Sequence, residues 1–571
     1  MVQEPRRGIA GLGRAVAPHL FFLPVLAVAV AVRVIAVRGY PAPWWFGDSA
    51  GYLKVAIDLG PGDLRPSGYP FLLWLLKPFH SFTVVVAVQH AIGVLTGVLV
   101  YLLVWRAGQA AWRRRPPGRL AWRRWLPGLI AAAATVPVLI PVHQIALEHM
   151  LMSDFLFTFL LLLAMTVILW RERMTWWTGG LAGLLMASAA LTRSAGLPLI
   201  LVLLVGMLLR RAGWRACVSA AGVYAVAILA YMAWFNSVYG QFTVAKASQI
   251  WLYGRTADFA DCRIIKPSPE LAIMCPKQTN PAISPAFSSM WTDDSAFRNI
   301  PGWVTGPHAD RLAGEFAWKA IMAQPGDYVG VIVRDTFRSF EWERKPYPTP
   351  WTWHQYEFSK GEEWADDDAL LAERYDPSGG GRPRVVEPHA SRVLAYQDDA
   401  AMPGTFLGYM MLAGLAGLVR NLRHLGRWRV GGGLLHWLRT VLLPGSLGLA
   451  LLVIPAATAD FDYRYVVPAV PFAIVAAALA LLPRPYDPEP GAEPAGAAAA
   501  ETAAEPDPGT GPETGPETEP EPGGTTGDDE AGDLEEAPAE AMEEDGAAAG
   551  KEPESASPAA ADPGQRGADR T

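Results

Sequence analysis

The stretch Phe46–Lys77 reads FGDSAGYLKVAIDLGPGDLRPSGYPFLLWLLK and decides how the rest of the chain is interpreted. It follows the first hydrophobic segment and carries too many polar groups to cross a bilayer. Two apolar runs within it, Leu53–Leu59 and Phe71–Leu76, are too short to span and suit helices lying at the membrane interface. Its charged side chains belong either to a solvated linker or to a site for chemistry on a lipid-linked phosphate.

The composition is that of a membrane protein with an acidic tail. Of 571 residues, 51% are hydrophobic, and there are 22 Trp, a residue enriched at the two faces of a bilayer. The formal net charge of −7 is unevenly distributed, because residues 485–571 contain 24 Asp and Glu against 3 Lys and Arg. That tail has almost no large apolar side chains to bury, so we expect it to be disordered.

Ten hydrophobic segments are predicted to span the membrane, with both termini on the cytoplasmic side. They are His19–Val37, Phe82–Trp105, Trp125–Val142, Phe155–Trp170, Trp176–Leu191, Leu197–Leu209, Cys217–Phe235, Phe406–Val419, Val441–Ala457 and Tyr465–Leu482.

Arginine-rich connectors fix the predicted orientation. Residues 106–124 contain seven arginines and no acid, so the positive-inside rule places this loop in the cytoplasm. The other basic connectors then fall on the same side. We therefore expect a multi-pass protein of the plasma membrane: a membrane core over residues 1–235 with an external loop at 38–80, an extracytoplasmic domain at 236–402, further membrane helices at 403–484, and the tail.

The external segment 236–402 is too long for a plain connector and too aromatic for a disordered one. It contains Cys262 and Cys275, 13 positions apart, outside the reducing cytoplasm. A disulfide between them is therefore expected. Zinc would need two further ligands, and none lies within a few residues of either cysteine. The sequence predicts an all-α polytopic membrane protein with a mixed extracytoplasmic domain and a disordered acidic C-terminal tail.

Charged residues gather in four clusters at the external ends of spans. A phosphate ester there would need cations, and Arg193 and Arg464 are well placed. Transfer to a hydroxyl or amine would need a carboxylate base, which Asp48 or Glu148 could supply. Ionisable groups at span ends are also often simple interfacial anchors. The clusters are the opening stretch, His143–Asp154, Arg193 and Asp460–Arg464.

Two of these clusters have rival interpretations. Arg464 has Asp460 and Asp462 close by in sequence, so it could belong to a structural ion pair. His143 and His149 with Glu148 could bind a metal, but their i, i+6 spacing does not put the two histidines on one helical face. A divalent metal is therefore not supported. Arg193 has no acid near it in the sequence.

Several well-known motifs are absent from the sequence. It has no Walker loop, no strand-linked dinucleotide fingerprint and no Gly-x-Ser-x-Gly. This argues against an ATP-driven pump, a hydrolase domain and a transferase with a soluble nucleotide-sugar domain. Nothing in the sequence indicates a nucleic-acid partner.

Five short motifs occur in order along the chain. They are Gly47-Asp48-Ser49-x-x-Tyr52-x-x-x-Ala56, Arg65-Pro66-Ser67-Gly68-Tyr69-Pro70, Glu148 with Ser153-Asp154-Phe155-Leu156-Phe157, Leu191-Thr192-Arg193, and Arg464-Tyr465-Val466-Val467-Pro468-Ala469-Val470-Pro471. Together they resemble the integral-membrane glycosyltransferases of the GT-C class. The nearest likeness is to the protein O-mannosyltransferase and aminoarabinose lipid A transferase group. The long external segment resembles more loosely some large actinobacterial membrane proteins.

The resemblance implies transfer of a sugar from a polyprenyl-phosphate carrier to a protein, lipid or glycan acceptor on the extracytoplasmic side, without an assured cofactor. Asp48 would be the catalytic base. The family often has paired acids where this chain has Asp48-Ser49, which weakens any metal site. The other implied residues are Arg193, Arg464, Arg65 and Lys54 for the carrier phosphate, Glu148 and Asp154 as secondary acids, and Tyr52 and Tyr69 as loop aromatics.

Two other functions stay open at this point. A lipid or polysaccharide transporter would place charged residues within its spans, and nearly all those in this chain lie at span ends. A non-catalytic assembly subunit of the same fold is the other alternative, favoured slightly by the single carboxylate at Asp48-Ser49.

Overall fold

The structure is a computed structural model of the chain, and it describes residues 19–113, 125–171, 173–277, 280–361, 366–379, 382–422 and 440–482. The described helices belong to one compact unit, Met1–Asp487. Over these ranges the chain contains helices and no strand. The predicted acidic tail and most residues of the two arginine-rich loops fall outside the described ranges.

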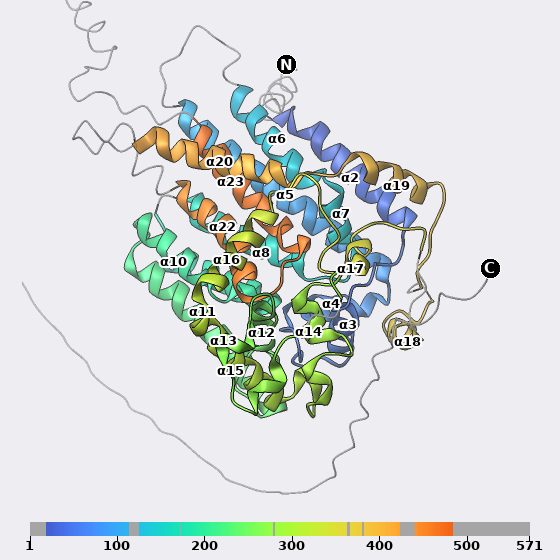
Figure 1. Cartoon of the computed structure of the whole chain (residues 1–571). Helices are drawn as coiled ribbons and strands as arrows, with labels where there is room; N and C mark the ends of the chain where they lie inside the picture. The colour runs from blue at the N-terminus through green and yellow to red at the C-terminus, as the bar shows by residue number, and fades with distance from the viewer. Residues whose placement is uncertain are drawn as a thin grey trace, which may run out of the picture. The chain divides into compact units, whose positions relative to one another are not determined.

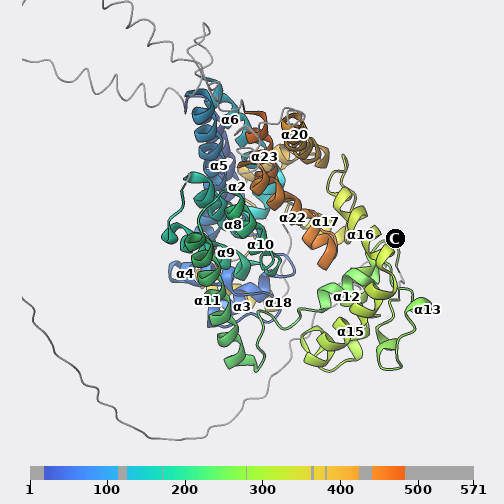
Figure 2. The same cartoon turned by 90° about the vertical axis from the view of Figure 1, so that its left-hand side faces the viewer.

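Each of the ten predicted spans overlaps a helix (Figure 1 and Figure 2). These are α2 (Phe22–Gly39), α5 (Phe82–Arg113), α6 (Leu126–Leu139), α8 (Asp154–Trp170), α9 (Trp176–Thr192), α10 (Leu199–Leu209), α11 (Trp214–Tyr239), α20 (Gly404–Leu422), α22 (Leu442–Thr458) and α23 (Val470–Leu481).

Among the described residues, four helices are long and apolar enough to cross a bilayer: α2, α5, α11 and the stretch Tyr463–Leu481. The number rises to six if each of two bent helix pairs is counted as one span. One joins α6 to α7 (Val142–His149) at 56°, and the other joins α19 (His389–Asp399) to α20 at 54°. Helices α8 and α22 are apolar but shorter. The chain is a membrane protein, and each bent pair is either a broken span or a re-entrant loop.

Close packing between spans depends on small residues. Helix α9 lies against α11, and Gly179 and Gly183 of α9 sit one turn apart on the shared face. A Cβ atom at either position would come within 2.2 Å of the carbonyl oxygen of Ala216 or Ala220 on α11. Small residues at this spacing let two helix backbones approach where hydrophobic driving force is weak.

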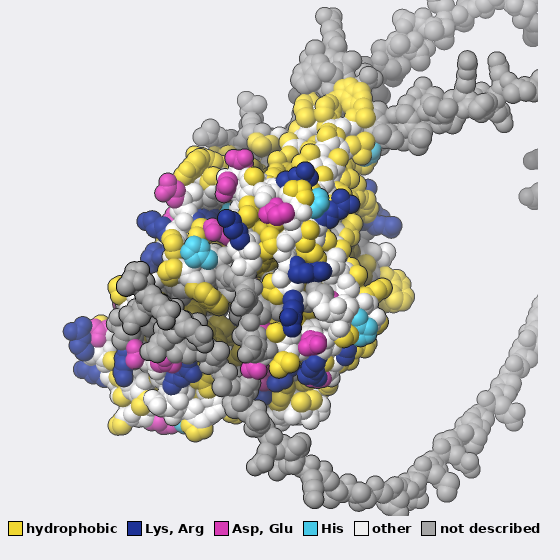
Figure 3. Space-filling view, turned by 90° about the vertical axis from the view of Figure 1, so that its right-hand side faces the viewer, with side chains coloured by type: hydrophobic (Ala, Val, Ile, Leu, Met, Phe, Trp, Pro, Cys, Tyr) yellow, Lys and Arg dark blue, Asp and Glu magenta, His cyan; other side chains and the backbone are white. Residues whose placement is uncertain are grey.

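The surface differs along the molecule. Figure 3 shows a face whose upper end is covered by hydrophobic side chains, with charged side chains scattered over the middle and lower parts. Helix α2 exposes Leu23, Val28 and Val34 at 46%, 50% and 43%. Apolar side chains exposed along a span-length helix suit contact with lipid.

The polar stretch that opened the sequence folds as two short helices, as its apolar runs predict. Helix α3 (Ser49–Asp58) and helix α4 (Gly68–Leu76) pack on each other. Their buried side chains form a cluster of their own with residues from α5 and α8. The stretch is therefore folded into the molecule and is not a free linker.

The external segment is helical in its described part. Its main elements are α12 (Ile250–Ala257), α13 (Cys262–Ile265), α14 (Pro285–Trp291), α15 (Pro307–Ala323), α16 (Pro325–Arg338), α17 (Pro350–His354), α18 (Asp366–Tyr375) and α19. Helices α12, α14 and α15 enclose a separate apolar core, and Figure 2 shows α12, α15 and α16 grouped apart from α2, α5 and α6. Cys262 and Cys275 form the predicted disulfide at the edge of this core.

Candidate active site at the start of α3

Asp48 lies immediately before α3 and is held there by its neighbours. Ser49 is fully buried, and its hydroxyl donates to the carbonyl oxygen of Leu151 at 3.0 Å. Trp44 pairs through its backbone with His149 and Leu151 at 3.2 and 2.9 Å. The first external loop is thus fastened to the loop after α7. Ser49 therefore has a structural role beside Asp48.

Two arginines from separate parts of the chain contact the Asp48 carboxylate. Arg65 Nη2 lies 3.3 Å and Arg464 Nη1 3.4 Å from Asp48 Oδ2. Burial alone raises the pKa of Asp48, but Arg65, Arg464 and the more distant Arg193 outweigh it and hold the pKa below its ordinary value. The carboxylate is therefore ionised at neutral pH, and 18% of its side chain remains exposed.

Arg464 is oriented by three other residues. Its Nε lies 3.1 Å from Asp462 Oδ2, and its guanidinium carbon lies 4.5 Å from the ring centroid of Phe46. Tyr356, from the external segment, donates its hydroxyl to Asp462 Oδ1 at 2.5 Å and stacks on Phe46 at 5.6 Å. The rival interpretation of Arg464 as part of an ion pair with Asp462 is thus correct, but the same arginine also reaches Asp48.

The sequence shows no acid close to Arg193, but the structure gives this arginine an acidic partner. It forms an ion pair with the buried Asp154, the first residue of α8, and its guanidinium carbon lies 5.0 Å from the ring centroid of Tyr465. The two residues line a hollow of about 20 Å³ whose other wall is apolar and comes from α22. A cation thus lies beside an apolar surface.

The remaining residues of the first loop divide into two groups. Tyr52 and Tyr69 are buried: the Tyr52 hydroxyl lies 3.1 Å from that of Ser153, and Tyr69 donates to Gln89 at 2.6 Å. Burial is the main reason why the pKa of Tyr52 is raised to about 12. Lys54 lies on the exposed face of α3, away from the arginines. The structure therefore does not bring Lys54 to the site.

Glu148, the second candidate for the base, belongs to a different group. Its carboxylate accepts hydrogen bonds from Arg33 at 2.7 and 2.9 Å and from Gln144 at 3.0 Å, and it lies 3.0 Å from His90. A Cβ at Gly93 would come within 1.9 Å of this carboxylate. Glu148 is 0% exposed, so it cannot meet an acceptor and its role here is structural.

The histidine pair proposed for a metal does not assemble. His149 Nδ1 lies 3.1 Å from His90 Nε2, while His143 lines a separate hollow beside Arg344. Among the described residues, neither histidine belongs to a group of side chains placed to hold a metal ion.

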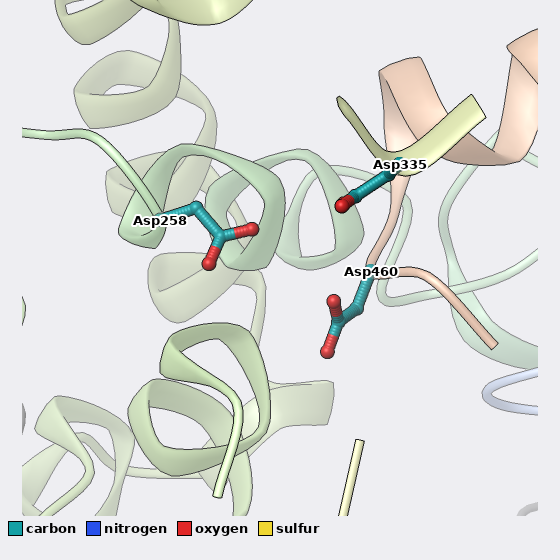
Figure 4. A group of neighbouring side chains, drawn as sticks. All are labelled: Asp258, Asp335 and Asp460. Carbon is teal, nitrogen blue, oxygen red and sulfur yellow. The ribbon is translucent and has the colours of Figure 1, made fainter. Parts of the chain in front are cut away.

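Another group of acids does converge. Asp258, Asp335 and Asp460 offer oxygen atoms within 4.8 Å of one another, and Figure 4 shows their side chains facing a common centre. Arg255 is fully buried beside them and forms ion pairs with Asp258 and Asp335, the latter at 2.6 Å. Arg334 also pairs with both of these acids, and Asp460 accepts hydrogen bonds from Ser284 and Tyr347. The group therefore fits a structural link between α12, α16 and the end of α22.

Comparison with known proteins gives little beyond the geometry. No family model matches the chain. No curated protein matches it. Among solved structures, it is similar to ArnT from Cupriavidus metallidurans in the apo state (13% identity, TM-score 0.30) and bound to undecaprenyl phosphate (15% identity, TM-score 0.28). Each match covers 80% of this chain and 76% of that chain. TM-scores this low do not decide a function.

The sequence missed the residues that orient Arg464. Asp462 was noted only as a rival partner, and Tyr356 lies more than a hundred positions away in a segment without a recognisable motif. The one available signal was the high density of Trp and Tyr between residues 342 and 356, which marks aromatic side chains that usually find a buried partner.

Proposed function

We propose that the chain is a GT-C glycosyltransferase that moves a sugar from a polyprenyl-phosphate carrier to an acceptor on the extracytoplasmic side of the membrane. The observation that carries the proposal is the carboxylate of Asp48 between Arg65 and Arg464, at 3.3 and 3.4 Å. A base beside guanidinium groups is what displacement of a phosphate leaving group requires.

In the proposed reaction the acceptor hydroxyl or amine gives its proton to Asp48 and attacks the anomeric carbon of the sugar. The bond from that carbon to the phosphate oxygen breaks, and both of its electrons leave with the phosphate on its lipid. The arginines stabilise the growing negative charge. A phosphate leaves already charged and needs little protonation, so one carboxylate is enough.

The low pKa of Asp48 makes it a weak base while the arginines pair with it. A donor phosphate that takes up Arg65 and Arg464 would compete with the carboxylate for these cations. Its approach would therefore raise the pKa of Asp48 and strengthen the base only when the donor is in place.

We propose that the lipid part of the donor lies along the apolar side of the hollow at Arg193, which at about 20 Å³ has to widen to admit it. Its apolar wall includes Ala450, Leu451 and Ile454 of α22, which suits an isoprenoid chain. Arg193 and Asp154 stand at the polar end of the same hollow, where the carrier phosphate would lie.

The acceptor is assigned to the external segment 236–402. Two of its residues reach the site: Tyr356 through Asp462, and Trp251 through its ring, 4.1 Å from the guanidinium carbon of Arg65. The sugar would be a hexose or a pentose, and the acceptor a protein, a lipid or a glycan.

The test is sugar transfer by the purified full chain. We expect label to leave a polyprenyl-phosphate-linked hexose or pentose and to appear on cell-envelope acceptors, with no use of nucleotide sugars. If all lipid-linked donors keep their label, the transferase proposal is wrong. Intact donor crossing the bilayer of proteoliposomes would instead favour the transporter alternative.

A further inference from the structure

A second hollow on the external side contains an arginine and a histidine that the proposed reaction does not use. It lies between α6, α7, the start of α23 and the connector after α16, and Arg344 and His143 line it. The adjoining hollow beside Tyr356 and Arg464 is lined by the same two residues. Two neighbouring hollows thus share one pair of basic side chains.

One buried polar atom of each residue has no hydrogen-bond partner among the described residues. Arg344 Nη1 and His143 Nδ1 are buried, and neither makes a hydrogen bond to any described residue. The other terminal nitrogen of Arg344 donates to the carbonyl oxygen of Met402 at a long 3.4 Å. Buried polar groups are normally satisfied, and an unsatisfied cation is among the costliest to leave.

No described carboxylate balances the charge on Arg344, which forms no ion pair within the described ranges, unlike Arg33, Arg193 and Arg255. Its guanidinium carbon lies 5.5 Å from the ring centroid of Tyr463, a weak compensation at most. Burial lowers the pKa of Arg344 to about 10, which still leaves it charged at neutral pH. The site is therefore complementary to an anion.

The other walls of the hollow are apolar and belong to spans. Pro137 and Val138 come from the end of α6, and Val470 and Pro471 from the start of α23. A guanidinium group at the end of an apolar wall suits a ligand with an anionic head, because arginine binds phosphate through paired hydrogen bonds.

We propose that Arg344 and His143 form a second phosphate-binding site, separate from Asp48 and its arginines, that takes the phosphate group of an amphiphile or free phosphate. The hollow has a volume of about 20 Å³, roughly room for one water molecule. The flexible Arg344 side chain must therefore turn outward as the phosphate enters. This site does not depend on the proposed transferase activity, since binding is measured without transfer.

The test is ligand binding to the purified full chain with three probes: farnesyl phosphate, inorganic phosphate and farnesol. We expect Arg344→Met to weaken phosphate binding at this second site at least about tenfold, the loss expected for a charge-assisted hydrogen bond. Binding at the proposed donor site should not change. Lys345→Gln is the matched control, since it removes a neighbouring exposed charge and should not change binding. If Arg344→Met weakens binding of farnesyl phosphate only, the site is specific for an amphiphile. If it also weakens binding of inorganic phosphate, the phosphate group alone is sufficient for binding.

Thermal melting shows whether a loss of binding in Arg344→Met comes from a folding defect. An unpaired buried cation gives nothing to stability, so Arg344→Met without ligand should melt no lower than the wild type. Farnesyl phosphate should raise the melting temperature of the variant less than that of the wild type, because the variant keeps the proposed donor site at Arg65, Arg193 and Arg464. A variant that melts well below the wild type would show that Arg344 has a structural partner. Unchanged phosphate affinity in Arg344→Met, or no phosphate binding by the wild type, would overturn the site.

Discussion

Two arginine–carboxylate groups lie near span ends that the sequence predicts to be external, and they differ in how fully each carboxylate is enclosed. Glu148 accepts two hydrogen bonds from Arg33 at 2.7 and 2.9 Å and is fully buried. Asp48 meets Arg65 and Arg464 at 3.3 and 3.4 Å and keeps 18% of its side chain exposed.

The difference separates a structural role from a chemical one. A short, bidentate, fully enclosed pair has no capacity left for a ligand, and its removal leaves a buried charge behind. A longer and partly exposed pair can exchange its partners for a substrate phosphate and an acceptor proton. The sequence offered both carboxylates as bases, and geometry distinguishes them.

The largest expected effect is on stability, and it falls on only one of the two groups. Glu148→Gln leaves Arg33 buried without its counter-charge, which should cost about 3–5 kcal/mol of unfolding free energy. Asp48→Asn disrupts a partly exposed pair and should cost less than about 1 kcal/mol. Thermal or denaturant unfolding in one detergent compares the two variants. Equal losses would contradict the division of roles.

The second effect is on the leaving-group cation. Arg464→Gln should lower kcat/KM for sugar transfer about 100-fold, because it removes a charged donor from the phosphate. The matched control is Arg374→Gln, which removes an exposed arginine paired with Asp58 at 3.1 Å and should change the rate little. Similar losses in both variants would mean that Arg464 acts through general surface charge.

A smaller effect tests how the external segment positions Arg464. Tyr356→Phe deletes the hydroxyl that donates to Asp462 and should reduce transfer about tenfold, as loss of a hydrogen bond to a charged group does. Tyr375→Phe, which loses a buried hydroxyl bonded to the Leu73 carbonyl, is the control for stability. If both variants transfer at the wild-type rate, Tyr356 has no positioning role.

The smallest effect is on pH dependence. The lowered pKa of Asp48 keeps it ionised as the pH falls from 8 towards its ordinary value of 3.8. Burial raises the pKa of Asp462, so Asp462 is protonated at a higher pH than Asp48. Protonation of Asp462 removes its ion pair with Arg464. The acid limb of kcat/KM should therefore report Asp462.

Tyr356→Phe sharpens this assignment. The Tyr356 hydrogen bond lowers the pKa of Asp462, so its loss should move the acid limb to higher pH. An acid limb at the same pH in this variant and the wild type would assign the limb to another group.

Much of the helical framework follows from the sequence, because apolar runs of span length have few alternatives to a helix in lipid. The grouping of Asp48 with Arg65, Arg193 and Arg464 also matches the prediction that charged span ends meet on one side. These residues lie near span ends that the positive-inside rule predicts to be on the same side of the membrane.

The pairing of individual charges could not be predicted. Glu148 forms an ion pair with Arg33, which lies 115 positions earlier and inside the first predicted span. Arg193 forms an ion pair with Asp154 at the start of α8. Such pairs depend on how helices pack, which hydrophobic patterning does not specify. Lys54 lies opposite Tyr52, Leu53 and Ala56, which form the buried face of α3, and its contact with the carrier phosphate stays a prediction.

The most direct test is the rate of sugar release from a polyprenyl-phosphate donor by purified Asp48→Asn protein, measured beside the wild type. Loss of the base should reduce transfer by at least about 100-fold, while the melting temperature stays within a few degrees. Transfer at the wild-type rate by folded Asp48→Asn protein would contradict the assignment of Asp48 as the catalytic base.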